Sequence, residues 1–286
     1  MKTSNVRKAM FAGSWYPSSA SECEREITSF LKEGKNLKTP DRRLVGGIVP
    51  HAGWYFSGSI ACNVISRLKS KDTPDVIVVF GMHLHPDSRC YLMTEGAWQT
   101  PFGEIPVEES LAAELVKNFS FTLETPDRFS QDNTVELQLP FIKYFFEDTK
   151  IVAMGVPPSK SSLEIGKSVI GLAKKLGLTA KVIGSTDLTH YGANYGFTSK
   201  GRGQKAVDWV RSVNDRRVID AMLALEPEKV ISEALASQNA CCAGAAATAI
   251  KAAKTLGANQ ADEIAYTTSY DKSPGDSFVG YVGVVM

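Results

Sequence analysis

The chain has 286 residues, of which 43% are hydrophobic and 22% are charged, and its formal net charge is +1. This composition is ordinary for a globular protein, and the length suits one large domain or two small ones. A net charge this close to zero, with no long basic run, excludes a global electrostatic attraction to nucleic acid or to an anionic membrane.

The sequence gives no targeting or membrane signal. Met1–Lys8 is not followed by the apolar stretch of a signal peptide, and apolar runs elsewhere are short and interrupted by charge. The five cysteines form an odd, sparse set that includes the adjacent pair Cys241 and Cys242, which is poor geometry for an ordinary disulfide. We therefore expect a reduced, cytoplasmic protein with free thiols.

Predicted helices and strands alternate along the chain. Capping residues and the spacing of apolar residues predict helices over 18–35, 57–69, 108–118, 133–146 with a break at Pro140, 162–176, most of 204–236, and 241–256. Apolar runs predict strands near 44–50, 75–80, 150–156, 180–185, 263–269 and 277–286, and an extended segment near 90–93. No linker or repeat divides the chain. We expect one α/β domain, residues 1–286, with a central mixed, largely parallel sheet and helices on both faces.

Three of the four histidines lie just beyond apolar β-runs. His51 follows the run at 44–50, His83 the run at 76–81, and His190 the run at 181–184. Ligands of open α/β sheets bind beyond the carboxyl ends of the strands, so imidazoles from separate strands can converge there on a metal ion or an acid–base centre. Each histidine alone could instead bond a loop carbonyl, but the three together favour a shared site.

Two spacings refine this hypothesis. His83 and His85 would both face one ion on an extended segment, whereas a turn directs only one of them there. Asp187 and His190 stand three residues apart, and a carboxylate beside an imidazole raises its pKa and fixes its tautomer. This pair is a candidate acid–base pair, although Asp187 could instead cap the following turn.

A thiol and a carboxylate complete the candidate residues. Cys242 begins an Ala-rich predicted helix, whose N-terminus favours the thiolate, the form that binds metal or attacks carbon. Helical phase does not decide between Cys241 and Cys242. Asn133 as a helix cap with Glu136 three residues later resembles a capping box, and Glu136 is also a candidate carboxylate near the site.

Five motifs, in order, resemble those of the Memo family, whose prokaryotic members are called AmmeMemoRadiSam system protein B. They are AGSWYP at 12–17, PHAG at 50–53, SRC at 88–90, VELQLPF at 135–141 and STDLTHYG at 185–192. The resemblance runs from near residue 10 to the C-terminus. It implies a fold similar to that of class III extradiol (LigB-like) dioxygenases, in which two histidines and one carboxylate hold Fe(II).

In the Memo family a cysteine takes the place of that carboxylate. The resemblance therefore implies His51, His83 and Cys242 as metal ligands, with His85 and Cys241 as competitors. It implies Asp187 and His190 as the adjacent polar pair, and Trp15 as an aromatic residue at the rim of the pocket. Iron(II) is the implied cofactor, and the same ligands also suit copper and zinc.

Three functions remain open from the sequence. The first is a metal-dependent redox or dioxygenase-like protein acting on a small molecule. The second is an adaptor that binds a ligand or phosphopeptide in a pocket rimmed by Trp15, Trp54 and Arg89. The third is a thiol hydrolase that uses Cys242 with His190 and Asp187. The family name also suggests a functional link with AMMECR1-like and radical-SAM proteins.

Overall fold

The computed structural model describes residues 5–38, 40–71 and 73–286, so Met1–Ser4, part of the segment considered for a signal peptide, lie outside the described residues. Its strands are β1 (Val6–Arg7), β2 (Gly46–Val49), β3 (Val76–Gly81), β4 (Cys90–Met93), β5 (Ala97–Thr100), β6 (Gly103–Pro106), β7 (Phe121–Glu124), β8 (Lys150–Gly155), β9 (Ala180–Ser185), β10 (His190–Tyr191), β11 (Asp262–Thr268) and β12 (Phe278–Val285). Its α-helices are α1 (Ala20–Glu33), α2 (Trp54–Arg67), α3 (Glu109–Asn118), α4 (Asn133–Glu136), α5 (Leu139–Phe145), α6 (Lys160–Lys175), α7 (Gln204–Trp209), α8 (Asp215–Leu223), α9 (Pro227–Ser237) and α10 (Ala243–Thr255).

The main sheet is mixed, with a parallel centre. Its strand order is β10-β12-β2-β9-β3-β8-β4-β7, and β11 pairs with β12. Strands β2, β9, β3 and β8 are mutually parallel, whereas β12 joins β2 and β4 joins β8 in antiparallel pairs. The short strands β1, β5 and β6 form a separate small sheet. The prediction of a mixed, largely parallel sheet is confirmed.

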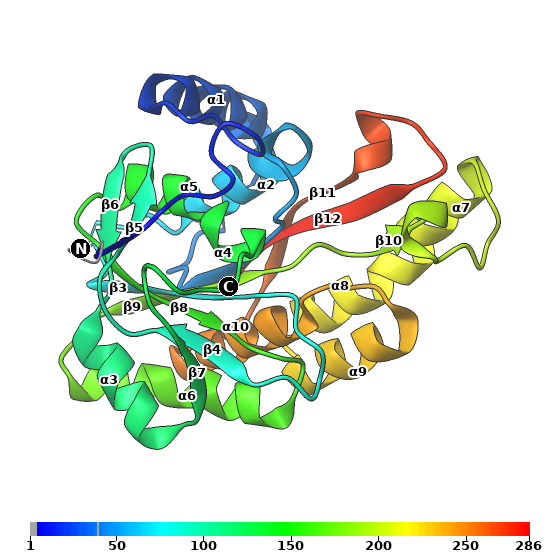
Figure 1. The fold of residues 1–286 in the computed structure, drawn as a ribbon. Coiled ribbons are helices and arrows are strands. Elements are labelled where there is room, and N and C mark those ends of the chain that lie inside the picture. The colour runs from blue at the N-terminus through cyan, green and yellow to red at the C-terminus, as the bar shows by residue number, and fades with distance from the viewer. Residues whose placement is uncertain (1–4, 39, 72) are drawn as a thin grey trace.

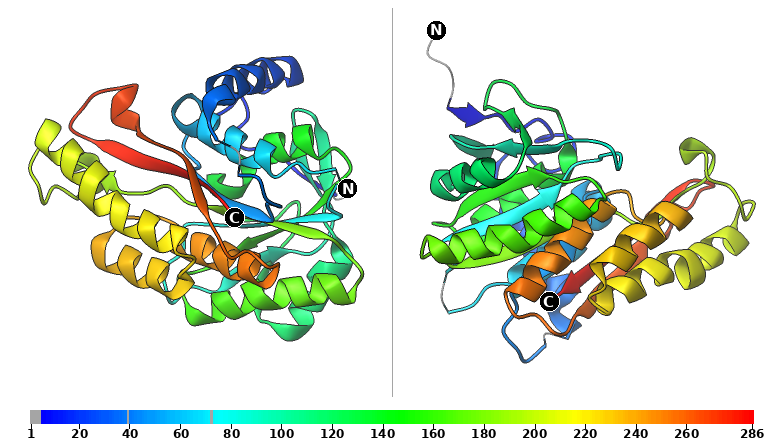
Figure 2. Two further views of the ribbon diagram at one scale, coloured as in Figure 1. Left: turned by 180° about the vertical axis from the view of Figure 1, so that it is seen from behind. Right: turned by 90° about the horizontal axis from the view of Figure 1, so that it is seen from below.

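Helices cover both faces of the main sheet, as the continuous apolar runs of its central strands require. Figure 1 shows α1, α2 and α5 on one face and α3, α6 and α10 on the other. The right-hand view in Figure 2, seen from below, shows α6 (green) and α10 (orange) side by side across the sheet. Within the described residues, no helix is long and apolar enough to cross a membrane.

Some predicted elements differ in extent. The helix predicted over 133–146 is two helices, α4 and α5, and Pro140 lies in the first turn of α5, where its missing N–H would have no partner in any case. The helix predicted from residue 57 begins earlier, at Trp54. The region 204–236 holds three α-helices, and a π-helical turn over Val210–Asn214 separates α7 from α8.

Candidate metal centre

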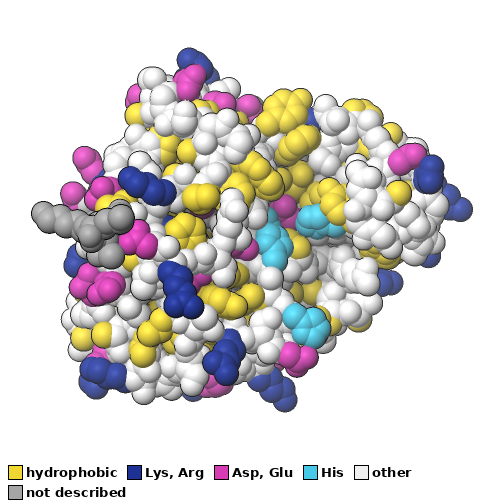
Figure 3. Space-filling view, viewed as in Figure 1, with side chains coloured by type: hydrophobic (Ala, Val, Ile, Leu, Met, Phe, Trp, Pro, Cys, Tyr) yellow, Lys and Arg dark blue, Asp and Glu magenta, His cyan; other side chains and the backbone are white. Residues whose placement is uncertain are grey.

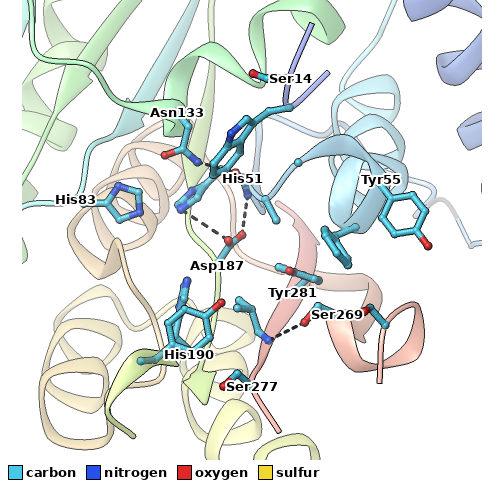
Figure 4. A pocket seen from close by; sticks show the side chains of 17 residues that line it. Ser14, His51, Tyr55, His83, Asn133, Asp187, His190, Ser269, Ser277 and Tyr281 are labelled. Atoms are coloured by element: carbon cyan, nitrogen blue, oxygen red, sulfur yellow. Dashed lines mark hydrogen bonds and ion pairs between the residues drawn. The ribbon is translucent and has the colours of Figure 1, made fainter. Parts of the chain in front are cut away.

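Three adjacent parallel strands deliver the central residues of the site. His51 lies two residues past β2, Asp187 two residues past β9, and His83 two residues past β3. Because neighbouring parallel strands end at the same edge of a sheet, these side chains meet there. Figure 4 shows His51, His83, Asp187 and His190 directed into one space.

His51 is 2% exposed, and both its backbone and its ring are held in place. Its N–H donates to Asp187 Oδ1 (2.7 Å), and Asn133 Nδ2 donates to its carbonyl oxygen (2.8 Å). The His51 Nδ1 lies 3.0 Å from Ser185 Oγ, and the Ser185 hydroxyl already donates to the Thr134 carbonyl (2.8 Å). The Ser185 oxygen therefore accepts from Nδ1–H, which leaves His51 Nε2 with a lone pair for a metal.

His83 is positioned by an unusual backbone. Met82, just before it, has φ +71°, a left-handed conformation that is rare for a residue with a side chain. The preceding Gly81 packs so closely that a Cβ there would lie 2.3 Å from Thr134 Oγ1. The His83 Nδ1 lies 3.1 Å from Asp132 Oδ2. Because a carboxylate only accepts, Nδ1 carries the proton and the second ring nitrogen is left for the site.

Both candidate cysteines reach the same place. Cys241 Sγ lies 3.3 Å from His51 Nε2 and 3.7 Å from Cys242 Sγ. The ligand atoms of His51, His83, Cys241 and Cys242 all lie within 4.8 Å of one another. The structure thus brings in Cys241 as well as the predicted Cys242, and Cys241 is the thiol in hydrogen-bond contact with His51.

His85 does not join this cluster. Its side chain is 74% exposed and pairs with the exposed Asp87, whose Oδ2 lies 3.4 Å from His85 Nδ1. Residues 82–85 after β3 are not in a strand, and a turn follows at Pro86 and Asp87, so the segment directs only His83 to the site.

The cluster favours a thiolate at Cys241. Burial raises the pKa of this thiol, but a hydrogen bond with Cys242 and the charge and hydrogen bond of His51 outweigh burial, so its pKa lies well below the usual range. Burial and the neighbouring Cys241 raise the pKa of Cys242. Burial lowers the pKa of His83, but hydrogen bonds with Asp132 and Cys241 prevail and raise it to about 10.

The predicted Asp187–His190 pair does not form a hydrogen bond within the described residues. Asp187 Oδ2 lies 3.9 Å from His51 Nε2, and burial raises the pKa of Asp187 while the charge of His51 opposes that rise. His190 Nδ1 lies 3.2 Å from the Leu188 carbonyl oxygen, which can only accept a hydrogen bond. Leu188, rather than Asp187, thus fixes the His190 tautomer and leaves Nε2 as an acceptor.

A cavity of about 540 Å³ opens beside the cluster. Figure 3 shows histidine side chains in a hollow of the surface on this side of the molecule. The cavity is lined by Ser14, Trp15, His51, Ala52, Gly53, Tyr55, Phe56, His83, Asn133, Asp187, His190, Tyr195, Ser269, Ser273, Ser277, Val279 and Tyr281. Its lining is rich in hydroxyl groups and aromatic rings, and none of these described residues is Lys or Arg.

Two of the three residues predicted at the pocket rim lie elsewhere. Trp15 lines the cavity and is 41% exposed. Trp54 instead belongs to the core: it is 2% exposed, and its ring stacks on Phe141 with centroids 4.1 Å apart. Arg89 is exposed and is not among the lining residues.

Sequence reasoning also missed the residues that hold the others in place. Asp132, not Asn133, caps α4, and the same carboxylate contacts His83. Glu136 does not close a capping box. Its carboxylate accepts hydrogen bonds from the backbone of Met10 (2.9 Å) and Phe11 (2.7 Å) and from the Tyr16 hydroxyl (3.0 Å), which anchors the loop that carries Trp15. Of these supporting residues, Ser185 could have been found from the sequence, because it is a polar residue at the end of an apolar run.

Comparisons with known proteins agree with this architecture. A solved structure of an uncharacterized protein from Escherichia coli K12 superposes with a TM-score of 0.53 and 13% identity, covering 85% of this chain and all of that one. At this identity the likeness concerns the fold alone, and it defines a mixed α/β protein of the same class.

The sequence comparisons are more specific. MEMO1 family proteins of Pyrococcus furiosus and Pyrococcus horikoshii are each 32% identical to this chain, over 98% and 96% of it and over 99% and 97% of their own lengths. A MEMO1 family protein of Methanopyrus kandleri is 30% identical over 98% of both chains. The family described as Memo-like protein matches residues 7–285. The chain belongs to this family.

Proposed function

We propose that this protein binds one transition-metal ion through His51, His83 and Cys242, with the neighbouring Cys241 in the same cluster, and that a small molecule binds in the adjoining cavity. The observation that carries the proposal is the convergence of the His and Cys ligand atoms within 4.8 Å. Each imidazole directs its second nitrogen into the cluster because its Nδ1 is occupied by Ser185 or Asp132. The resemblance implies iron(II), and the donor set also suits copper and zinc.

A bound iron ion would supply Lewis acidity and one-electron redox chemistry, as the dioxygenase-like hypothesis requires. The chain's own groups bind and orient the small molecule. The aromatic rings of Trp15 and Tyr195 offer stacking surfaces, and Ser277 and Ser273 offer hydroxyl groups. His190 Nε2, an acceptor because Nδ1–H faces Leu188, would take a proton from the bound molecule.

Geometry argues against the two alternative functions. A phosphopeptide site pairs the phosphate with arginine or lysine side chains, and the described cavity lining contains neither; its basic histidine, His83, is already paired with Asp132 (3.1 Å). A thiol hydrolase needs its thiol and its carboxylate on different nitrogens of one imidazole. The hypothesis used Cys242, His190 and Asp187. Here His190 Nδ1 faces the Leu188 carbonyl oxygen (3.2 Å) and Asp187 Oδ2 lies 3.9 Å from His51 Nε2, so the described residues do not form that triad.

Metal titration of the apoprotein tests the proposal. We expect protein stripped with a chelator under anaerobic conditions to bind one equivalent of Fe²⁺, Zn²⁺ or Co²⁺ in equilibrium dialysis with elemental analysis. Anaerobically prepared protein that contains and binds no transition metal would overturn the proposal.

His190→Ala is expected to keep the metal but to lose its proton acceptor, because His190 is not part of the four-residue cluster. The probe is 4-nitrocatechol, whose absorbance reports loss of its proton. We expect the wild-type protein to shift this spectrum and His190→Ala to do so at least ~10²-fold less effectively, in line with general acid–base contributions. Loss of metal in a folded His190→Ala protein would instead make His190 a ligand.

Asp132→Ala is expected to weaken metal binding by ~10–100-fold, because the carboxylate holds Nδ1 of His83 and orients the ring. The matched control is Asp87→Ala, which removes the carboxylate beside the exposed His85. Both affinities would be measured by competition with a chromophoric chelator. Equal affinities for the two variants would show that Asp132 does not position His83.

A further inference from the structure

The two adjacent cysteines before α10 differ in their access to solvent. Cys242 is 3% exposed, whereas Cys241 is partly exposed and lines a second groove of about 350 Å³. The other three thiols, Cys23, Cys62 and Cys90, are each at most 7% exposed. Cys241 is therefore the thiol of this chain that a small oxidant in solution reaches first.

The groove that reaches Cys241 adjoins the large cavity but is separate from it. Its apolar lining includes Leu188 and Leu235, and it shares His190 and Tyr195 with the cavity. Cys241 lines the groove and is not among the described residues that line the cavity. A small reactant can therefore approach this sulfur from the groove, whether or not a molecule is bound in the cavity.

The backbone holds the two sulfurs in contact, with Cys242 Sγ 3.7 Å from Cys241 Sγ. Successive side chains of an extended chain point to opposite sides, but here the chain turns just before α10. The Cys241 N–H donates to the Asp187 carbonyl and the Cys242 N–H donates to Thr186 Oγ1, each at 3.1 Å. We infer that Cys241 and Cys242 are a peroxide-reactive pair, which a hydroperoxide converts into a disulfide between consecutive residues.

The reaction balances with one molecule of hydrogen peroxide. The Cys241 thiolate attacks a peroxide oxygen: the S–O bond forms, the O–O bond breaks, and hydroxide leaves and takes a proton from solvent. Cys242 Sγ then attacks the sulfenic sulfur: the S–S bond forms, the S–O bond breaks, and the leaving hydroxide takes the Cys242 proton. The two sulfurs are oxidised by two electrons, the peroxide is reduced, and the products are one disulfide and two waters.

Chain geometry makes this bridge easy to reverse. The Cα atoms of consecutive residues lie about 3.8 Å apart across a trans peptide bond, closer than the roughly 4.4–6.8 Å of ordinary disulfides. A bridge in unfavourable geometry is more readily reduced, so a dithiol returns the pair to its thiols. The bridge also takes both sulfurs out of the cluster with His51 and His83, and this consequence alone rests on the proposed metal binding.

Peptide mapping after oxidation tests the inference on the full-length protein. Chelator-treated protein would be exposed to hydrogen peroxide, denatured, alkylated and digested with trypsin. Cleavage after Lys229 and Lys251 releases both cysteines in one peptide, residues 230–251, which contains no other cysteine. We expect this peptide to resist alkylation and to be about 2 Da lighter than its reduced, unalkylated form. Dithiothreitol should restore both thiols.

Single substitutions assign the two roles. Cys242→Ser should leave the sulfenic acid of Cys241 without a partner, so that dimedone labels Cys241. Cys241→Ser should slow peroxide oxidation of the 230–251 peptide at least ~10-fold, because the remaining thiol is buried. The matched control is Cys90→Ser, which removes a buried thiol on β4 and should leave disulfide formation unchanged. Circular dichroism of each variant confirms that the fold is retained.

The rate of bridge formation shows whether the fold or mere adjacency makes the pair. Because the folded chain holds the two sulfurs in contact, we expect the protein to form the disulfide at least ~10-fold faster than a synthetic peptide of residues 230–251. A rate equal to that of the peptide, an intermolecular bridge, or oxidation that stops at the sulfenic or sulfinic acid of Cys241 in the wild-type protein overturns the inference.

Metal titration of the same protein tests the proposed function separately. A protein that binds no metal but forms the disulfide supports this inference and removes the proposed function. A protein that binds metal but forms no disulfide in its chelator-treated form overturns the inference and leaves metal binding in place.

Discussion

His51→Ala is expected to lower the affinity for Zn²⁺ or Co²⁺ by more than about 100-fold, because it removes a ligand of the centre. The ring is 2% exposed, and its Nε2 is in direct contact with Cys241. Removing it deletes a donor that no neighbouring side chain replaces, and loss of a mere orienting partner already costs ~10–100-fold. Competition against a chelator of known affinity gives the ratio.

The control for this substitution is His85→Ala, because His85 is exposed and lies outside the cluster. The fold should survive His51→Ala, since the anchors on either side of the ring are the His51 backbone N–H and carbonyl, which alanine retains. If His51→Ala and His85→Ala bound metal equally tightly, the ion would sit elsewhere and the assignment of the centre would be wrong.

The sequence predicted which strands carry the site residues, because one physical rule determines where the ends of those strands lie. Apolar runs marked β2, β3 and β9 as buried strands, and parallel strands end at a common edge, so His51, His83 and Asp187 had to lie near one another. The rule needs only the order of elements. The rule tolerates errors of a few residues at the ends of the elements. The prediction of a shared site therefore held although the second helix begins at Trp54 and not at residue 57.

The directions of individual side chains depended on turns, which the spacing of apolar residues does not predict. The positive φ of Met82 turns the chain so that His83 faces the cluster and His85 faces solvent. The turn before α10 brings in Cys241 beside Cys242. The short strands β5 and β6 carry polar and glycine residues and gave no apolar run to detect.

The misplacement of Trp54 has a different cause. Its neighbour His51 marks a loop, and an aromatic residue three positions later suited a pocket rim. α2 begins at that residue, however, and directs Trp54 into the core, whereas Tyr55 and Phe56 of the same turn line the cavity. The indole packs among Tyr16, Phe30 and Phe141, with ring centroids 5.6, 5.9 and 4.1 Å away, and its Nε1 donates to the Leu137 carbonyl (3.2 Å).

Trp54→Ala should therefore destabilise the fold by about 3–5 kcal/mol, the cost typical of removing a large buried aromatic side chain and leaving a cavity. Equilibrium unfolding of the apoprotein in urea measures the loss. Tyr55→Ala is the matched control, because Tyr55 is the next residue on the same helix and is 64% exposed, so its truncation should change stability by no more than about 0.5 kcal/mol.

The two locations of Trp54 make opposite predictions. If Trp54 lies in the core, Trp54→Ala lowers the unfolding midpoint strongly and affects binding of 4-nitrocatechol only as far as the fold is weakened. If Trp54 lay at the rim, Trp54→Ala would leave the unfolding midpoint near that of Tyr55→Ala and remove binding of the probe outright. Wild-type stability together with lost binding in Trp54→Ala would contradict the stacking on Phe141 and restore Trp54 to the pocket. We expect the first result, because the indole is stacked, hydrogen-bonded and closed off from the cavity that its neighbour Tyr55 lines.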